Sequence, residues 1–100
     1  METNVQKPKV VHGEVSSVGP LQYKRDGTAR RTLTVKVAEG RETQYIGAYL
    51  VGEDATNGVI RLGVPIVIVY RFSSSNERII LDYYFEWFIY ILWIEILEEI

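Results

Sequence analysis

The stretch Gly19-Pro-Leu-Gln-Tyr-Lys-Arg-Asp-Gly-Thr-Ala-Arg-Arg-Thr-Leu-Thr-Val-Lys-Val37 decides the fold. Its second half alternates apolar and polar residues, which is the period of a strand with one buried face. The apolar set is Leu33, Val35 and Val37, and the polar set is Thr32, Thr34 and Lys36. Before this strand, Asp26-Gly27 is a two-residue hairpin signal, because a type I′ turn needs positive φ at both central positions. The stretch therefore predicts a hairpin with one buried face.

Cationic side chains surround this turn and continue onto the polar face of the strand. They are Lys24, Arg25, Arg30, Arg31 and Lys36, and only Asp26 opposes them. A twisted hairpin with a cationic loop and a polar face can cradle a polyanion. The same residues also suit an ordinary solvated hairpin, so the choice between the two depends on the rest of the chain.

The remaining sequence predicts four more strands and a single helical turn. The five strands are Lys9–Val18, Arg31–Val37, Thr43–Val51, Ile66–Phe72 and Arg78–Tyr84, with at most one helical turn in 52–58. Gly13 and Gly19-Pro20 predict bends in the long first strand. Short hairpins and one longer connection, between the third and fourth strands, predict an all-β, five-stranded Greek-key barrel. We expect it to span residues 9–84, after a polar lead-in over residues 1–8.

Composition argues against several classes of function. The 100 residues make one domain and include no cysteine, which excludes disulfides, thiolate zinc sites and thiol catalysis. No apolar signal segment precedes the barrel, so we expect an intracellular protein. His12 is the only imidazole, and Glu53-Asp54 reads as the cap of a helical turn. Without a phosphate-binding glycine loop, a nucleophile elbow or metal-ligand spacing, we predict no enzyme, no cofactor and no metal.

Charge is divided unevenly along the chain. Residues 1–81 carry a net charge of +3, and residues 82–100 carry −5 with no Lys or Arg. The longest charge-free run in this acidic tail is Trp87–Ile94, which is too short for a membrane span of about 20 residues. A membrane-attached barrel is therefore the minority interpretation.

The tail, residues 85–100, is apolar on nearly every side if it is helical, and one small barrel covers only one side of a helix. An extended final strand is the competing interpretation, because Ile, Phe, Tyr and Trp favour strands. We favour a helix, since Glu95, Glu98 and Glu99 then share one side. We expect this segment to mediate homo- or hetero-oligomerisation through Phe85, Trp87, Phe88, Ile91, Leu92, Ile94 and Ile96.

Several short motifs together resemble the OB-fold domains of replication protein A and of archaeal single-strand-binding proteins. They are Val11-His-Gly-Glu-Val15, Arg25-Asp-Gly27, Leu33-Thr-Val35, Leu50-Val-Gly-Glu-Asp-Ala55, Ile60-Arg-Leu-Gly63, Ile66-Val-Ile-Val69 and Ile80-Leu81. The resemblance implies an OB barrel with a C-terminal apolar helix, like the small subunits of such complexes. Those domains often carry a tryptophan where this chain has Val51, so one stacking platform is missing.

In an OB barrel, nucleic acid would lie across the second and third strands, between the first-second and fourth-fifth loops. Cations would track phosphates and aromatic rings would stack on bases. The candidate residues are Lys24, Arg25, Arg30, Arg31, Lys36, Tyr45, Tyr49, Arg71, Phe72 and Arg78. We therefore predict a non-catalytic protein that binds single-stranded DNA or RNA; the alternative is an adaptor whose barrel is a scaffold for assembly.

Overall fold

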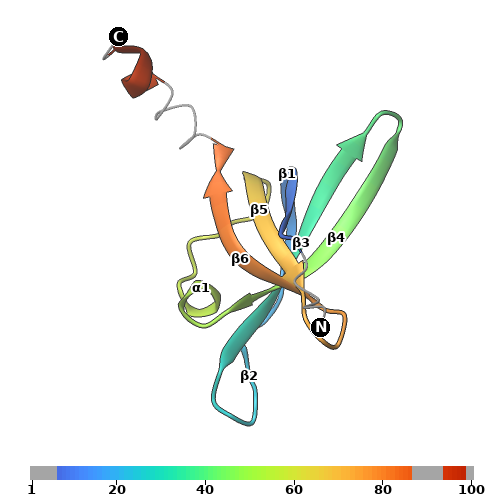
Figure 1. The fold of residues 1–100 in the computed structure, drawn as a ribbon, viewed down its shortest axis with the longest axis vertical. Coiled ribbons are helices and arrows are strands. Elements are labelled where there is room, and N and C mark those ends of the chain that lie inside the picture. Colours follow the sequence, from blue (N-terminus) through green and yellow to red (C-terminus); the bar gives the residue numbers. More distant parts are fainter. Residues whose placement is uncertain (1–6, 87–93, 99–100) are drawn as a thin grey trace, which may run out of the picture.

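The computed structural model describes residues 7–86 and 94–98, which form six strands and two short helical segments (Figure 1). The elements are β1 (Lys9–Val18), β2 (Gln22–Tyr23), β3 (Ala29–Glu39), β4 (Glu42–Val51), α1 (Glu53–Thr56), β5 (Pro65–Phe72) and β6 (Arg78–Phe85), followed by helical residues 94–98. The five long strands and the single helical turn match the predicted elements. Only β2, which pairs with the start of β3, was not predicted.

The five long strands close into a ring. β1 pairs with β5, β5 with β6, β3 with β4, and β1 also with β3, all antiparallel. The ring is completed by a parallel pairing of β4 with β6, through Tyr49 and Ile79. This connectivity is the predicted five-stranded barrel, and closure leaves the long strands few free edges.

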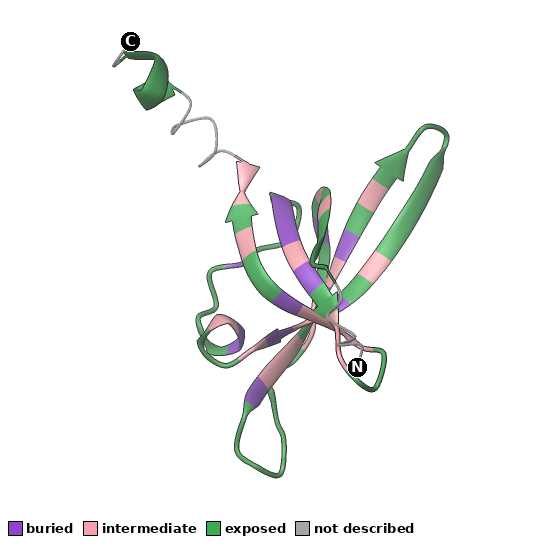
Figure 2. Ribbon diagram, viewed as in Figure 1, coloured by how far each residue is buried: buried purple, intermediate pink, exposed green. Residues whose placement is uncertain are grey.

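The core lies inside this ring and follows the predicted alternation. Leu33 and Val35 of β3 are fully buried, and Ala48 and Leu50 of β4 are almost so. The buried residues, coloured purple in Figure 2, alternate with more exposed ones along the strands. Burying each large aliphatic side chain stabilises the fold by about 1.5–3 kcal/mol. The period-2 pattern is therefore enough to choose the inner face of β3 and β4.

β1 bends to reach two partners, as its glycine predicts. A Cβ on Gly13 would lie 2.5 Å from both the Lys36 carbonyl oxygen and a Val35 methyl group. Only glycine permits this close approach of β1 to β3. β1 pairs with β5 over residues 9–14 and with β3 over residues 14–18, and a register shift between Val15 and Ser17 marks a bulge within the second pairing.

The C-terminal region departs from its predicted boundary. Phe85 ends β6 opposite Ile66 and is half-buried against the core, so it does not begin a helix. Ile94 and Ile96 lie in the helical residues 94–98, apart from the barrel in Figure 1. Trp87, Phe88, Ile91 and Leu92 lie outside the described residues. No helix in the described part of the chain is long and apolar enough to cross a membrane.

Candidate nucleic-acid interface

A groove of about 370 Å³ crosses the outer side of β3 and β4 between two hairpin loops, residues 24–28 and 73–77. Its lining comprises Lys24, Thr28, Arg30, Tyr49, Val51, Arg71, Ser73, Ser74, Ser75, Glu77 and Ile79. The groove coincides with the position that the resemblance assigns to nucleic acid. Its charged side chains are three cations and one carboxylate.

The first loop, residues 24–28, has a different turn from the one predicted. The Gly27 N–H donates to the Lys24 carbonyl and the Lys24 N–H to the Thr28 carbonyl, both at 2.9 Å. Gly27 has a φ of 86°, whereas Asp26 keeps a negative φ. The loop is thus a three-residue connection closed by a left-handed glycine, and the type I′ prediction is wrong. The Thr28 N–H donates to Asp26 Oδ1 at 2.9 Å, which holds Asp26 in the turn.

The Asp26 carboxylate is a built-in anion in the cationic loop. Hydrogen bonding from Thr28, with a smaller contribution from the charge of Lys24, lowers the pKa of Asp26 below its ordinary value of 3.8. Asp26 therefore stays ionised at neutral pH and partly offsets the positive charge of the loop.

The second loop, residues 73–77, repeats the backbone of the first with different side chains. The Asn76 N–H donates to the Ser73 carbonyl at 2.9 Å, and the Ser73 N–H to the Glu77 carbonyl at 2.8 Å. Asn76, with a φ of 63°, takes the left-handed position that Gly27 holds in the first loop. The loop side chains form a network of hydroxyl groups and one carboxylate, from Ser73, Ser75 and Glu77.

The floor of the groove comes from the outward residues of β3 and β4. Arg30 is paired with Val51, and its guanidinium carbon lies 4.8 Å from the centre of the Tyr49 ring. This cation–π contact holds a planar, charged group over an aromatic ring. Next to Tyr49 on the same face, the position of a Cβ on Gly47 has no atom within 4 Å. The open space predicted between Tyr45 and Tyr49 is present.

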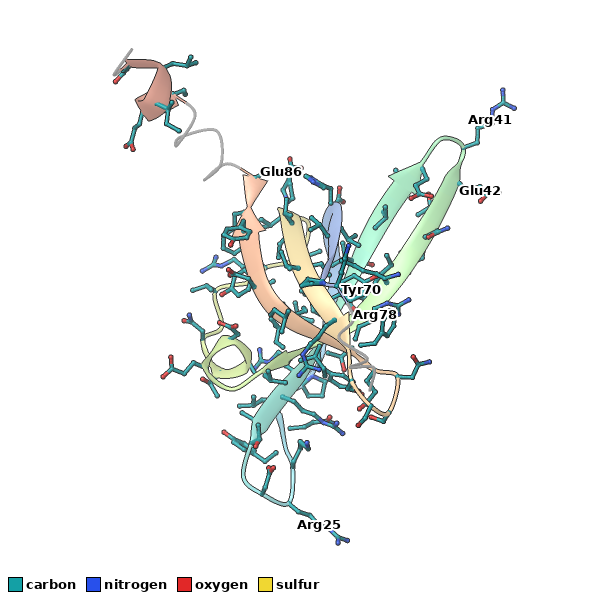
Figure 3. All side chains as sticks on the ribbon, in the orientation of Figure 1. Arg25, Arg41, Glu42, Tyr70, Arg78 and Glu86 are labelled. Carbon is teal, nitrogen blue, oxygen red and sulfur yellow. The ribbon has the colours of Figure 1, made fainter. Side chains whose placement is uncertain are left out.

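The structure brings four of the predicted site residues into the groove. These are Lys24, Arg30, Tyr49 and Arg71. Lys36 and Tyr45 form a cross-strand pair on the same face, farther along the β3–β4 arm, and 62% of Tyr45 is exposed. Arg25 lies at the tip of the first loop and points away from the barrel (Figure 3). The first loop therefore contributes Lys24, and not Arg25, to the groove.

Arg31 lies on the other side of the strand from Arg30. It lines a separate cavity with Val18 and Ile60, and its Nε is buried without a hydrogen-bond partner. Successive residues of a strand point to opposite faces, so Arg31 shares the parity of the buried Leu33. The prediction that Arg31 joins Arg30 in one wall is therefore wrong.

Arg78 and Phe72 lie behind the floor and do not line the groove. The Arg78 guanidinium carbon is 5.3 Å from the Phe72 ring centre and 5.7 Å from that of Tyr70, which is labelled beside it in Figure 3. Its Nη1 donates a long hydrogen bond, 3.5 Å, to the Gly47 carbonyl. Arg78 thus connects β6 to the strand that carries the floor. The wall predicted from Arg71, Phe72 and Arg78 is formed by Arg71 alone.

Sequence reasoning missed Glu77, the one acidic side chain among the described residues that line the groove. It follows Ser73-Ser-Ser-Asn76, which the sequence marks only as a turn. The signal that could have found it is the resemblance itself, which assigns the loop between the last two strands to the binding site. Any side chain of that loop is then a candidate.

Potential catalytic groups are not gathered in this groove. His12 lies on β1, with its Nδ1 4.0 Å from Glu86 Oε1, and Glu53 and Asp54 lie in the first turn of α1. Among residues 7–86 and 94–98, no group of three or more His, Cys, Asp or Glu side chains could hold a metal ion.

No protein-family model matches the sequence, and neither does any curated protein. Solved structures do match. The mitochondrial single-stranded DNA-binding protein Rim1 of S. cerevisiae has a TM-score of 0.70 at 11% identity, over 79% of this chain and 92% of that one. The SSB domain of a Synechococcus sp. protein also has a TM-score of 0.70, at 15% identity, over 83% of this chain and 99% of that one. The protein priB of Ralstonia solanacearum has a TM-score of 0.64, at 12% identity, over 81% of this chain and 99% of that one.

Because these sequence identities are low, the matches show a similarity of fold alone. The matches extend over about four fifths of the chain, which includes most of the ring of five long strands. The resemblance read from the sequence is thereby confirmed for the fold. The chain has the OB fold of the single-stranded DNA-binding proteins.

Proposed function

We propose that this protein binds single-stranded nucleic acid in the groove between residues 24–28 and 73–77, without catalysing a reaction. The observation that carries the proposal is the grouping of Lys24, Arg30 and Arg71 around Tyr49. Single-strand binding needs cations along the backbone and flat surfaces for bases, and this groove supplies both. Several of the matched structures are of single-stranded DNA-binding proteins, among them Rim1 of S. cerevisiae and SSBb of Mycobacterium smegmatis, and this agrees with the choice of ligand.

The three cations would contact phosphates, and Tyr49 with its stacked Arg30 would support a base. One stacked base contributes on the order of 1–3 kcal/mol. Three neutralised phosphates at about 0.7 released counterions each give a slope of roughly −2 for log K against log salt. Lys36 and Tyr45 lie on the same face and would extend the path along the β3–β4 arm.

A fluorescence-anisotropy titration with a short labelled thymidine oligonucleotide tests the proposal. We expect binding at low salt that weakens with a slope of roughly −2. Arg30→Ala and Arg71→Ala should each reduce the slope by about 0.7, and Arg30→Ala should also lower the affinity at every salt concentration.

Arg61→Ala is the matched control, because Arg61 is exposed and lines the separate cavity that also holds Arg31. It removes the same charge from the protein without touching the groove. Absence of binding at low salt, or equal slopes for Arg30→Ala, Arg61→Ala and the unmodified chain, would refute the proposal.

We also propose that the C-terminal segment mediates assembly of copies or partner subunits. Ile94, Ile96 and Leu97 are 55%, 56% and 58% exposed in the helical residues 94–98. Adjacent exposed aliphatic side chains on a short helix mark a contact surface. This observation also favours the second candidate function, an adaptor whose barrel serves as a scaffold.

Native mass spectrometry of the full chain and of Ile96→Asp separates the two functions. Loss of assembly with oligonucleotide binding retained supports a nucleic-acid-binding oligomer. Loss of assembly in a protein that binds no oligonucleotide before or after the change supports the adaptor. An unchanged mass for Ile96→Asp contradicts assembly through this segment.

A further inference from the structure

One carboxylate lies in a groove whose other charged side chains are cations. Glu77 lines the groove together with Lys24, Arg30 and Arg71. In the described part of the chain, no Lys or Arg nitrogen lies within 4.0 Å of the Glu77 carboxylate. A site built only for phosphate would gain nothing from an anion there, because the carboxylate repels phosphate. Glu77 therefore requires another explanation.

Hydrogen bonds hold the Glu77 side chain in place. The Ser75 hydroxyl donates to Glu77 Oε1 at 3.1 Å, and the Ser73 and Ser75 hydroxyl oxygens are 3.1 Å apart. The backbone N–H of Glu77 donates to Ser73 Oγ at 3.2 Å. The loop backbone is closed separately by the bond from the Ser73 N–H to the Glu77 carbonyl. The carboxylate is thus oriented by its own loop before any ligand arrives, with Oε2 left available as an acceptor.

An ionised carboxylate accepts hydrogen bonds and donates none. In a nucleic acid it can pair with the amino and imino groups of base edges. Guanine offers two adjacent donors, N1–H and the N2 amino group, which match the two oxygens of one carboxylate. Thymine offers one donor between two carbonyl oxygens, and those oxygens repel a carboxylate. The chemistry of Glu77 therefore discriminates between bases, whereas the cations do not.

We propose that Glu77 is a specificity-determining residue that reads the Watson–Crick edge of guanine, so that the groove prefers guanine-containing single strands to thymine tracts. This inference rests on the proposed function, because it needs a strand in the groove. Lys24, Arg30 and Arg71 hold the backbone, Tyr49 supports a base, and Glu77 selects it. A single well-placed pair of hydrogen bonds to a base gives about tenfold discrimination.

The test compares three labelled oligonucleotides of about eight nucleotides that are identical except at one central position. That position is guanine, inosine or thymine in an otherwise all-thymine strand, and one guanine cannot form a quadruplex. Inosine keeps N1–H but lacks the N2 amino group, so it removes one of the two donors. We expect affinities in the order guanine, inosine, thymine, with about tenfold between the first and the last.

Glu77→Gln keeps the side-chain shape and an oxygen that can accept from Ser75. We expect it to bind the all-thymine strand more tightly and to lose the guanine preference. Glu42→Gln is the matched control; it removes the same charge near the tip of the β3–β4 arm, where Figure 3 labels Glu42. It should leave the guanine-to-thymine ratio unchanged.

The outcomes separate this inference from the proposed function. Equal affinities for the three strands in the unmodified protein overturn the inference and leave strand binding intact. A guanine preference that survives in Glu77→Gln also overturns it. If none of the oligonucleotides binds at low salt, both the proposed function and this inference are refuted.

Discussion

The two loops that border the groove have the same backbone and opposite chemistry. Residues 24–28 and 73–77 each close with the same pair of backbone hydrogen bonds and a left-handed fourth residue. The first loop supplies Lys24 and Thr28 to the groove, and the second supplies three serines and Glu77. Turn geometry therefore sets where the loops reach, and side chains set what they contact. We infer that the first loop contacts the phosphate backbone of the nucleic acid and that the second loop contacts its bases.

The largest expected effect comes from the floor between the loops. Val51 is half-buried opposite Arg30 and lines the groove. Val51→Trp should add one stacking surface and tighten binding of a thymidine oligonucleotide by about 1–3 kcal/mol. Leu62→Trp is the control, because Leu62 is 67% exposed and lies outside the groove. Equal gains for the two variants in anisotropy titrations would show that tryptophan acts nonspecifically.

The backbone conformation that the two loops share can be tested by substitution of the residue with positive φ. Gly27→Val places a β-branched side chain at a φ of 86°, which should cost about 1–2 kcal/mol of unfolding free energy. For a domain of this size, that lowers the melting temperature by roughly 4–16 °C. Asn76→Gly makes the opposite change at the same loop position and should be neutral or mildly stabilising. Thermal unfolding followed by circular dichroism measures both, and a Gly27→Val variant as stable as the unmodified protein would contradict the equivalence of the loops.

The cationic loop can be made more cationic through Asp26. Asp26→Asn removes the anion beside Lys24 and keeps an oxygen that accepts from the Thr28 N–H. We expect oligonucleotide binding to tighten by about two- to threefold at low salt, with the difference vanishing at high salt. A gain that persists at high salt would mean that the substitution acts through loop shape.

The lowered pKa of Asp26 also has a signature in the free protein. The pKa of Asp26 in the folded protein lies below its ordinary value, because the ionised carboxylate accepts a hydrogen bond from Thr28. This hydrogen bond therefore stabilises the loop at pH values above the ordinary pKa, and the stabilisation is lost as the pH falls through the folded-state pKa. The amide resonance of Thr28 should therefore titrate below pH 3.8 in NMR spectra and should not do so in Asp26→Asn.

The smallest expected effect is at the second loop. Ser75→Ala removes the hydrogen bond to Glu77 Oε1 on an exposed surface, so stability should change by less than about 0.5 kcal/mol. The salt slope of oligonucleotide binding should not change, because no cation is altered. If Glu77 needs its loop partner for orientation, the guanine-to-thymine affinity ratio should fall. An unchanged ratio would show that Ser75 does not orient the carboxylate.

The errors made from the sequence have local and non-local causes. The inward position of Arg31 could have been predicted from the sequence, because counting back by two from Leu33 assigns Arg31 to the inner face. The turn at Asp26 was not, because Asp-Gly suits both a two-residue and a three-residue loop. The strand register, which pairs Tyr23 with Ala29, decides between them.

By itself, the sequence determined the five long strands, their inner faces and the OB barrel, because a period of two and glycine positions are local properties. It also placed Tyr49 outward from that barrel. Only the tertiary structure decided that Glu77 borders the same groove as Lys24 and Arg71. That neighbourhood depends on ring closure, where β6 meets β4 through Ile79 and Tyr49. Pairing between strands so far apart in the chain has no local signature, so the groove exists only once the barrel has closed.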